Sequence, residues 1–283
     1  MGRPGVRLQE VLASLDDIAA FSLAAAWDNV GLLVGDPAMA VTGILVALDP
    51  TAEVLAEAHE RQANVLVTHH PLIFQPLKAM RTDQPLGRML AMATRDHMAV
   101  VACHTNLDLA SGGVNDVLAA RLGLTDITPF TADNGATDKL TGLGRTGRYA
   151  APLRADEFIE RLMAALATPT LRMVGKLPPT IARVAVCGGS GADLAEAAWQ
   201  AGTQVLVTAE VKLSIARWSE AAGLCIIDAG HFPTENVIVP VLADVLRERL
   251  AHYGHDVKVG ITATQRDPFV PVRRDDHAGH CAP

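Results

Sequence analysis

Apolar residues in this chain form short unbroken runs that alternate with amphipathic stretches. Residues 44–49 and 65–68 are two such runs, and each predicts a buried strand. Between them, residues 51–62 are rich in Ala and Glu and predict a helix. Strands that are apolar along their whole length suit a sheet covered by helices on both faces, so the pattern favours an α/β fold.

The same strand–helix–strand pattern occurs again in the second half of the chain. Residues 184–186 and 205–208 predict strands, and residues 193–201 predict a helix. The Val-Leu-Val-Thr sequence of residues 65–68 is identical to that of residues 205–208. A chance match between two ordinary units is the alternative, but identity at equivalent places favours an internal β-α-β repeat. Each crossover is expected to be right-handed.

The repeat predicts two similar α/β lobes that face each other, residues 1–130 and residues 131–272. Residues 131–140 are expected to form a loop between the lobes, and the polar residues 273–283 a disordered tail. The remaining patterned segments predict helices at 6–14, 113–122, 156–167 and 240–250, and strands at 98–103 and 224–228.

Composition narrows the class of protein. The chain is 49% hydrophobic and 19% charged, as expected of an ordered globular protein. Its net charge of −7 argues against a polyanion partner, so nucleic acid is not expected to bind. The apolar stretch at residues 18–27 is too short to span a membrane. The four cysteines form no CxxC pair, which favours a reducing cytoplasm over a disulfide framework or a thiolate zinc site.

Three clusters of polar residues directly follow predicted strands, where open α/β sheets bind their ligands. His69 and His70 follow the strand at 65–68, with hydrogen-bonded strand-end histidines as the alternative interpretation. Asp108 follows the strand at 98–103 and could instead cap the next turn or helix. His231 and Glu235 follow the strand at 224–228 and are four residues apart, so a helical turn would place them on one face.

Glu235 could alternatively offset a helix dipole, as acidic residues near helix starts do. Taken together, however, the clusters supply three imidazoles and two carboxylates, a nitrogen and oxygen set without thiolate. This set suits zinc, iron, manganese, cobalt or nickel and suits calcium poorly. Five ligands are too many for one catalytic zinc with an open position. They fit two divalent metal ions in a cleft between the lobes if one carboxylate bridges.

Four strings in the sequence carry a resemblance to a known family. The strings are Trp-Asp-Asn-Val-Gly-Leu at 27–32, Thr-His-His-Pro-Leu-Ile-Phe at 68–74, His-Thr-Asn-Leu-Asp at 104–108 and Asp-Ala-Gly-His-Phe-Pro-Thr-Glu at 228–235. They resemble those of the Nif-three-like dinuclear metal centre proteins, often labelled GTP cyclohydrolase I type 2 homologs. The resemblance runs from about Val6 to Phe269 and matches the compact form that lacks the middle domain of longer members.

The resemblance implies two α/β lobes around one metal cleft, a toroidal homohexamer and hydrolysis that opens the guanine ring of GTP. It also implies that His70 and Asp108 hold one metal ion, that His69 and His231 hold the other, and that Glu235 bridges both. The chain contains no Gly-x-x-x-x-Gly-Lys-Ser/Thr loop, so nucleotide specificity rests on the resemblance alone.

One motif departs from the family pattern, which commonly shows Gly-Asp-x-Lys-x-His after the second-lobe strand. Residues 209–214 are Ala-Glu-Val-Lys-Leu-Ser, so the last histidine is replaced by Ser214. Glu210, Lys212 and His104 are therefore the candidates for acid–base chemistry or for orienting a ligand. The expected function is a dinuclear metal-dependent hydrolase acting on a small molecule. A metal-handling or scaffold protein without turnover is the alternative, and a nucleic-acid clamp is opposed by the acidic balance.

Overall fold

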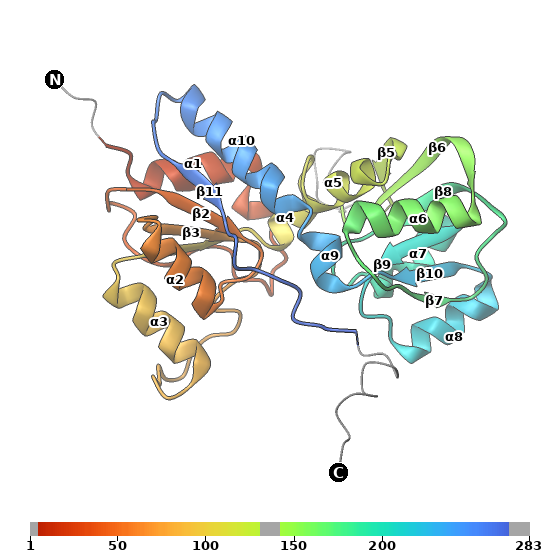
Figure 1. Cartoon of the computed structure of the whole chain (residues 1–283), viewed down its shortest axis with the longest axis horizontal. Helices are drawn as coiled ribbons and strands as arrows, with labels where there is room; N and C mark the ends of the chain where they lie inside the picture. Colours follow the sequence, from red (N-terminus) through yellow and green to blue (C-terminus); the bar gives the residue numbers. More distant parts are fainter. Residues whose placement is uncertain (1–4, 131–141, 272–283) are drawn as a thin grey trace, which may run out of the picture.

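The computed structural model describes residues 5–130 and 142–271, which form two α/β lobes side by side (Figure 1). The predicted fold class is confirmed. The loop expected at residues 131–140 and the tail expected at 273–283 lie outside the described residues. None of the helices within the described ranges is long and apolar enough to cross a membrane.

The first lobe is built on a five-stranded sheet with strand order β1-β4-β3-β2-β11. All neighbours in it are parallel except the edge strand β1, which runs antiparallel to β4. Apolar side chains of α1 and α10 pack on one face, and those of α2 and α3 pack on the other. The bounds are α1 Leu8–Ile18, β1 Gly31–Val34, β2 Ile44–Ala47, α2 Ala52–Glu60, β3 Val65–Thr68, α3 Pro85–Arg95, β4 Ala99–Ala102, α10 Ile238–His252 and β11 Val259–Ile261.

The second lobe is built on a six-stranded sheet with strand order β5-β6-β8-β9-β10-β7. Its centre, β8-β9-β10, is parallel, and the outer strands are antiparallel to their neighbours. Helices α5 and α6 cover one face and α7 and α8 the other. The bounds are α5 Val114–Arg121, β5 Thr125–Pro129, β6 Arg145–Arg154, α6 Ala155–Leu166, β7 Arg172–Val174, β8 Thr180–Val186, α7 Ala195–Gln200, β9 Val205–Thr208, α8 Leu213–Ala222 and β10 Cys225–Asp228.

The internal repeat has a structural counterpart in the two sheets. β2-α2-β3 and β8-α7-β9 are parallel strand–helix–strand units, and the two identical tetrapeptides form the fully buried strands β3 and β9. The helix predicted at 193–201 is shorter than expected, because residues Ala192–Leu194 form a 3₁₀ turn before α7 begins.

The predicted lobe boundary at residue 130 does not separate the two sheets. Strand β5 precedes it and yet belongs to the second sheet, while α10 and β11 follow it and belong to the first lobe. The apolar face of α10, which includes Leu242 and Leu246, packs against Leu8 and Leu15 of α1. The chain therefore crosses from the first lobe to the second through α5 and returns through α9 (His231–Glu235).

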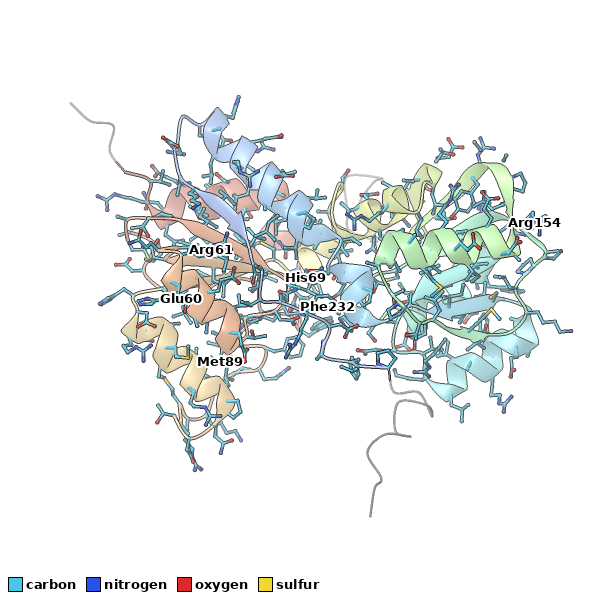
Figure 2. All side chains as sticks on the ribbon, viewed as in Figure 1. Glu60, Arg61, His69, Met89, Arg154 and Phe232 are labelled. Carbon is cyan, nitrogen blue, oxygen red and sulfur yellow. The ribbon has the colours of Figure 1, made fainter. Side chains whose placement is uncertain are left out.

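The lobes are oriented so that strand ends from both of them meet in the middle of the molecule. β3 and β4 end at Thr68 and Ala102, and β10 ends at Asp228, next to the short helices α4 (Thr105–Leu109) and α9. Figure 2 places His69 and Phe232 between the lobes, far from the labelled Arg154 at the outer end of the second. All three predicted clusters of polar residues therefore face one cleft.

Candidate metal centre

His69 and His70 leave β3 side by side and reach the same cluster of side chains. The backbone N–H of His70 still donates to Leu48 O at 2.9 Å, so the strand pairing continues to this point. The two rings lie with centroids 5.0 Å apart, and His69 is fully buried. His69 Nε2 is 3.7 Å from Asp108 Oδ1, whereas His70 Nε2 is 3.1 Å from Glu235 Oε2.

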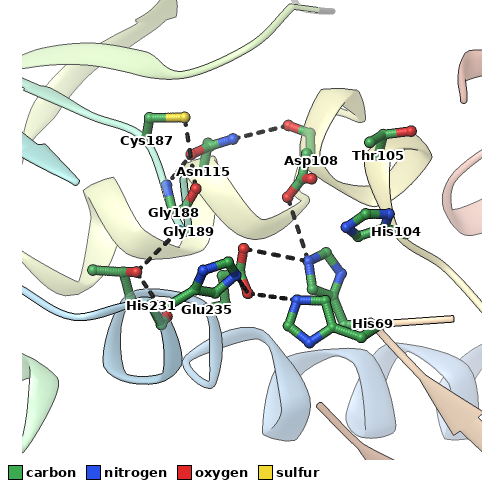
Figure 3. Close-up of polar contacts among 12 residues, drawn as sticks. His69, His104, Thr105, Asp108, Asn115, Cys187, Gly188, Gly189, His231 and Glu235 are labelled. Carbon is green, nitrogen blue, oxygen red and sulfur yellow. Dashed lines mark hydrogen bonds and ion pairs between the residues drawn. The ribbon is translucent and has the colours of Figure 1, made fainter. Parts of the chain in front are cut away.

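Asp108 does not cap a turn or a helix. It lies within α4, while the backbone N–H of Gly112 in the following turn bonds to Asp116 Oδ2 instead. Asp108 Oδ1 is buried and accepts no hydrogen bond. The capping interpretation of Asp108 is therefore wrong, and its carboxylate points to His69 (Figure 3).

The spacing of His231 and Glu235 places them on one face of α9, as predicted. His231 Nε2 is 3.0 Å from Glu235 Oε2. Gly230 has a φ of +87°, a conformation that glycine adopts without strain and that lets the chain turn from β10 into α9. Glu235 is the last residue of this helix, so its carboxylate does not offset the dipole of α9 itself.

The five side chains form two groups that share Glu235. One group contains His69 and Asp108, the other His70 and His231, and within each group the potential ligand atoms lie within 4.8 Å of one another. Glu235 Oε1 is the oxygen nearer His69, at 3.7 Å, and Glu235 Oε2 is the oxygen near His70 and His231. This grouping differs from the resemblance, which pairs His70 with Asp108 and His69 with His231.

Each of the three imidazoles is held by an oxygen on its Nδ1 side. Cys103 O bonds to Nδ1 of His69 at 2.8 Å, and Asp49 Oδ1 bonds to that of His70 at 2.7 Å. Glu210 Oε1 bonds to that of His231 at 2.7 Å. Because these oxygens accept, each Nδ1 carries a proton and each Nε2 faces the cluster. Histidines that bind metals in proteins show this arrangement.

Three buried polar atoms at the centre of the cluster have no hydrogen-bond partner, and such atoms indicate whether a metal ion would fit there. These atoms are His69 Nε2, Asp108 Oδ1 and Glu235 Oε2. Glu235 Oε2 is close to two imidazole nitrogens, yet neither contact has hydrogen-bond geometry. Buried polar atoms without partners are costly, and a cation among them would satisfy all three. The nitrogen and oxygen set therefore fits a transition-metal ion.

A glycine keeps room beside the shared carboxylate. Gly189, in the turn after β8, has a φ of +62°, and a Cβ there would lie 2.0 Å from Glu235 Oε1. Its backbone N–H donates to Thr234 Oγ1 at 3.0 Å, and Gly188 N–H donates to Asn115 Oδ1 at 2.9 Å. Asn115 also donates to Asp108 O at 3.1 Å, so one amide connects both sides of the cluster (Figure 3).

Without an ion, the imidazoles and carboxylates of the cluster shift one another's pKa values. Burial lowers the pKa of His70, but the adjacent carboxylates of Asp49 and Glu235 outweigh it and raise the pKa to about 10. The adjacent carboxylate of Glu235 raises the pKa of His231 to about 9. Burial raises the pKa of Asp108 to about 7, whereas the surrounding imidazoles overcome burial and hold the pKa of Glu235 well below its usual range.

His104 is a fourth imidazole at the cluster. Its ring centroid is 5.2 Å from that of His69, and its Nδ1 bonds to Asp28 Oδ1 at 2.8 Å. Asp28 Oδ2 also accepts from the Thr105 N–H at 3.0 Å. Burial lowers the pKa of His104, which favours the neutral ring.

The two other candidates have different positions. Glu210 lies at the cluster and orients His231, with its backbone in the left-handed region at a φ of +57°. Lys212 is exposed, and its ammonium group is 3.2 Å from Asp193 Oδ2. The predicted motif at 209–214 thus contributes Glu210 to the site, whereas Lys212 and Ser214 are exposed side chains.

Sequence reasoning missed several residues that shape the site. Asp49 is the last residue of the predicted strand at 44–49 and follows the end of β2 at Ala47, and this position at a strand end was the available signal. Asp28 lies within the Trp-Asp-Asn-Val-Gly-Leu segment at 27–32, but nothing in that segment indicates its contact with His104. Asn115 and Gly189 carry no signal, because helical asparagines and Gly-Gly turns are common for structural reasons.

The sequence matches known proteins over nearly its whole length. A family model described as Duf34/NIF3 (NGG1p interacting factor 3) matches residues 6–268. A Clostridium perfringens protein named GTP cyclohydrolase 1 type 2 homolog is 32% identical over 264 residues, which covers 93% of this chain and 99% of the relative. A Streptomyces coelicolor protein of the same name is 33% identical, with 93% of each chain covered.

The fold also matches solved structures. A Bacillus cereus protein related to NIF3 superposes with a TM-score of 0.89 at 25% identity, covering 95% of this chain and 100% of the other. Staphylococcus aureus protein SA1388 superposes with a TM-score of 0.88 at 28% identity, covering 94% and 99%. The two-lobed arrangement is thus shared with experimentally determined folds.

Proposed function

The chain belongs to the Duf34/NIF3 family, and we propose that it holds two divalent metal ions between its lobes and hydrolyses a small molecule there. The proposal rests mainly on Glu235. One of its carboxylate oxygens lies near His69 and the other near His70 and His231, which is the arrangement that a bridging carboxylate requires. His69, Asp108, His70 and His231 would complete the ligand set, two on each side.

The chemistry of this ligand set supports hydrolysis. A pair of divalent ions, when bound, lowers the pKa of water and stabilises charge that develops in the transition state. The protein's own contribution is to fix the orientation of the three imidazoles and to bury Glu235 and one carboxylate oxygen of Asp108. Curated relatives carry the name GTP cyclohydrolase 1 type 2 homolog, so GTP is the first substrate to test.

Metal content and turnover, measured together, test the proposal. Wild-type protein purified without added metal should contain about two metal ions per subunit by mass spectrometry. Glu235→Gln keeps the size of the side chain but weakens the bridge, and it should lose metal and any GTP hydrolysis. Glu196→Gln, on the exposed surface of α7, is the matched control. Full turnover by metal-loaded Glu235→Gln would contradict a role for the bridge.

A metal-handling protein without turnover is the second candidate. Two observations favour it: Glu210 is already engaged with His231, and Lys212 is paired with Asp193 outside the cluster. Neither group is then free to move protons to a substrate. Isotope exchange distinguishes the two functions, because a handler should exchange bound zinc readily, whereas a catalytic centre should retain it through many turnovers.

A further inference from the structure

Two adjoining cavities open beside the metal centre. The smaller, about 220 Å³, is lined by His70 and Asp49, and the larger, about 600 Å³, extends along the second lobe to Arg121 and Arg172. Both are lined by the same four residues, Glu210, His231, Phe232 and Phe269. A continuous path therefore leads from the candidate metal ligands to two arginines, and its volume lies in the range that binds small molecules.

The last described segment of the chain forms one wall of both cavities. It leaves β11 in the first lobe and crosses to the second (Figure 1, dark blue). Gln265 anchors it, because its Oε1 accepts from the Leu48 N–H at 2.6 Å and its Nε2 donates to Asn236 Oδ1 at 3.1 Å. Phe269, four residues farther on, is 80% exposed although it lines a cavity. An exposed phenylalanine at this place provides apolar surface for a bound molecule.

The charges in the larger cavity indicate which molecule fits. Its acidic residues are engaged: Glu210 holds His231, Asp267 Oδ1 accepts from the Phe269 N–H at 2.9 Å, and Asp228 Oδ2 is 3.5 Å from Arg172 Nη1. Arg121 has no ion-pair partner within residues 5–130 and 142–271. The rest of the wall is largely apolar, formed by Leu166, Leu171, Phe232, Pro233, Phe269 and Val270. An apolar cavity with an unpaired guanidinium in its wall suits an organic anion.

We propose that the larger cavity is the substrate pocket and that it takes a phosphorylated molecule with a planar ring. The ring would lie between the walls formed by Phe232 and Phe269, beside the metal centre, and the phosphate would lie at Arg121. This inference rests on the proposed hydrolase function and adds the class of substrate to it. It assigns Arg121 as a residue that determines specificity and has no role in holding metal.

A pair of probes that differ only in the phosphate tests the proposal. Binding of GMP and of guanosine to metal-loaded full-length protein is measured by calorimetry, after excess metal is removed. Wild type should bind GMP at least tenfold more tightly than guanosine. Arg121→Ala should remove most of this difference. Phe269→Ala should weaken both ligands and leave the difference unchanged, and Arg217→Ala, on the surface of α8, should match wild type.

The alternative that the phosphate binds the metal ions directly gives a different result. In that case Arg121→Ala would keep the full preference for GMP, and the proposal would be overturned. Failure of wild type to bind GMP more tightly than guanosine would overturn it as well. Metal content and GTP turnover measured on the same samples separate this proposal from the proposed function. If the protein binds two metal ions and hydrolyses GTP, but Arg121→Ala leaves the KM unchanged, the proposed function stands and the proposed substrate pocket is wrong.

Discussion

At the scale of single residues, the side chains around the metal centre matter as much as its ligands. His70 and His231 are each held through Nδ1 by a carboxylate, Asp49 and Glu210, whereas His69 is held by the Cys103 carbonyl. These oxygens fix the tautomer and turn each Nε2 toward the cluster. Each imidazole therefore depends on a second residue that does not itself reach the centre.

Removal of the acceptor that holds His70 should weaken metal binding. We expect Asp49→Ala to lower zinc affinity by about 10- to 100-fold, because the ring loses its orientation and part of its basicity. Asp49→Asn keeps an acceptor oxygen and should recover part of the affinity. Competition with a chelating dye measures both, and Glu160→Ala, at an exposed acid on α6, is the control. Equal affinities in all proteins would show that Asp49 does not position His70.

Metal binding should release protons from the two outer imidazoles. Their pKa values of about 10 for His70 and about 9 for His231 mean that both are protonated at pH 7 when no ion is bound. A metal ion must displace these protons, so its apparent affinity should rise with pH from 7 toward 9 and level off above these pKa values. These two imidazoles should release about two protons per subunit at pH 7, and Asp108, with a pKa of about 7, should add to that number.

Calorimetry in two buffers with different ionisation enthalpies counts these protons. Release of no proton at pH 7 would mean that His70 and His231 are neutral before the ion binds. The double variant Asp49→Asn, Glu210→Gln removes both flanking charges and should therefore release fewer protons than wild type.

At the scale of elements, the turn after β8 leaves space for Glu235. Gly189 combines a positive φ with a Cβ position only 2.0 Å from Glu235 Oε1. Gly223, which ends α8, has a similar φ of +75° but nothing within 4 Å of its Cβ position. A comparison of substitutions at these two glycines therefore distinguishes the effect of backbone strain from the effect of a steric clash with Glu235.

We expect Gly189→Ala to abolish binding of at least one metal ion, because the new methyl group must displace the shared carboxylate. Gly223→Ala carries a comparable strain of about 1 kcal/mol and should keep its full metal content. Metal content by mass spectrometry and the urea midpoint give the two readouts. Loss of metal in both variants would show that destabilisation alone explains the effect.

The elements that sequence reasoning found are those with uniform burial. β3, β4, β9 and β10 are unbroken apolar runs, and each was predicted because its side chains are buried on both faces of a parallel sheet. β6 was missed because its ten residues include buried Arg145 and exposed Arg148, so no alternation of period two is visible. Helix α3 was missed although Pro85 stands at its first position.

The ligands could be predicted, but most of the residues that hold them could not. Histidines and acids directly after strands carry a signal in their position, which placed His69, His70, Asp108, His231 and Glu235 in one cleft. Asp28 and Asn115 act across the fold, on partners far away in the chain. Such contacts depend on how the lobes pack, which no local pattern encodes. The hexamer implied by the resemblance stays a prediction, and light scattering in solution tests it.

At the scale of the whole molecule, the candidate metal ligands come from both sides of the junction between the two lobes. His69, His70 and Asp108 come from the first lobe, whereas His231 and Glu235 lie on the helix by which the chain returns from the second. Without an ion, buried atoms such as His69 Nε2 and Asp108 Oδ1 remain without partners. Bound ions should therefore stabilise the whole fold and not only the cluster.

Removal of metal with a chelator should lower the melting temperature. At an ion concentration 100 times the dissociation constant, the stabilisation is about 2.7 kcal/mol, which corresponds to about 5 °C or more for a chain of this size. Calorimetric melting of the holo and chelated proteins measures the change, and added zinc should restore it. Glu235→Gln should melt at the same temperature with and without chelator. An unchanged melting temperature in wild type would contradict a centre that joins the lobes.

Because α10 and β11 return to the first lobe, the two lobes cannot be completed in the order of the sequence during translation. The core between α1 and the first sheet includes Leu242, Leu246 and Val259, which are among the last described residues to be synthesised. The second sheet is complete by Asp228, so that lobe can fold while the first still lacks a helix and an edge strand. During translation the apolar face of α1 therefore stays uncovered until α10 has been synthesised. A nascent chain stalled near residue 236 would expose Leu8 and Leu15 to chaperones.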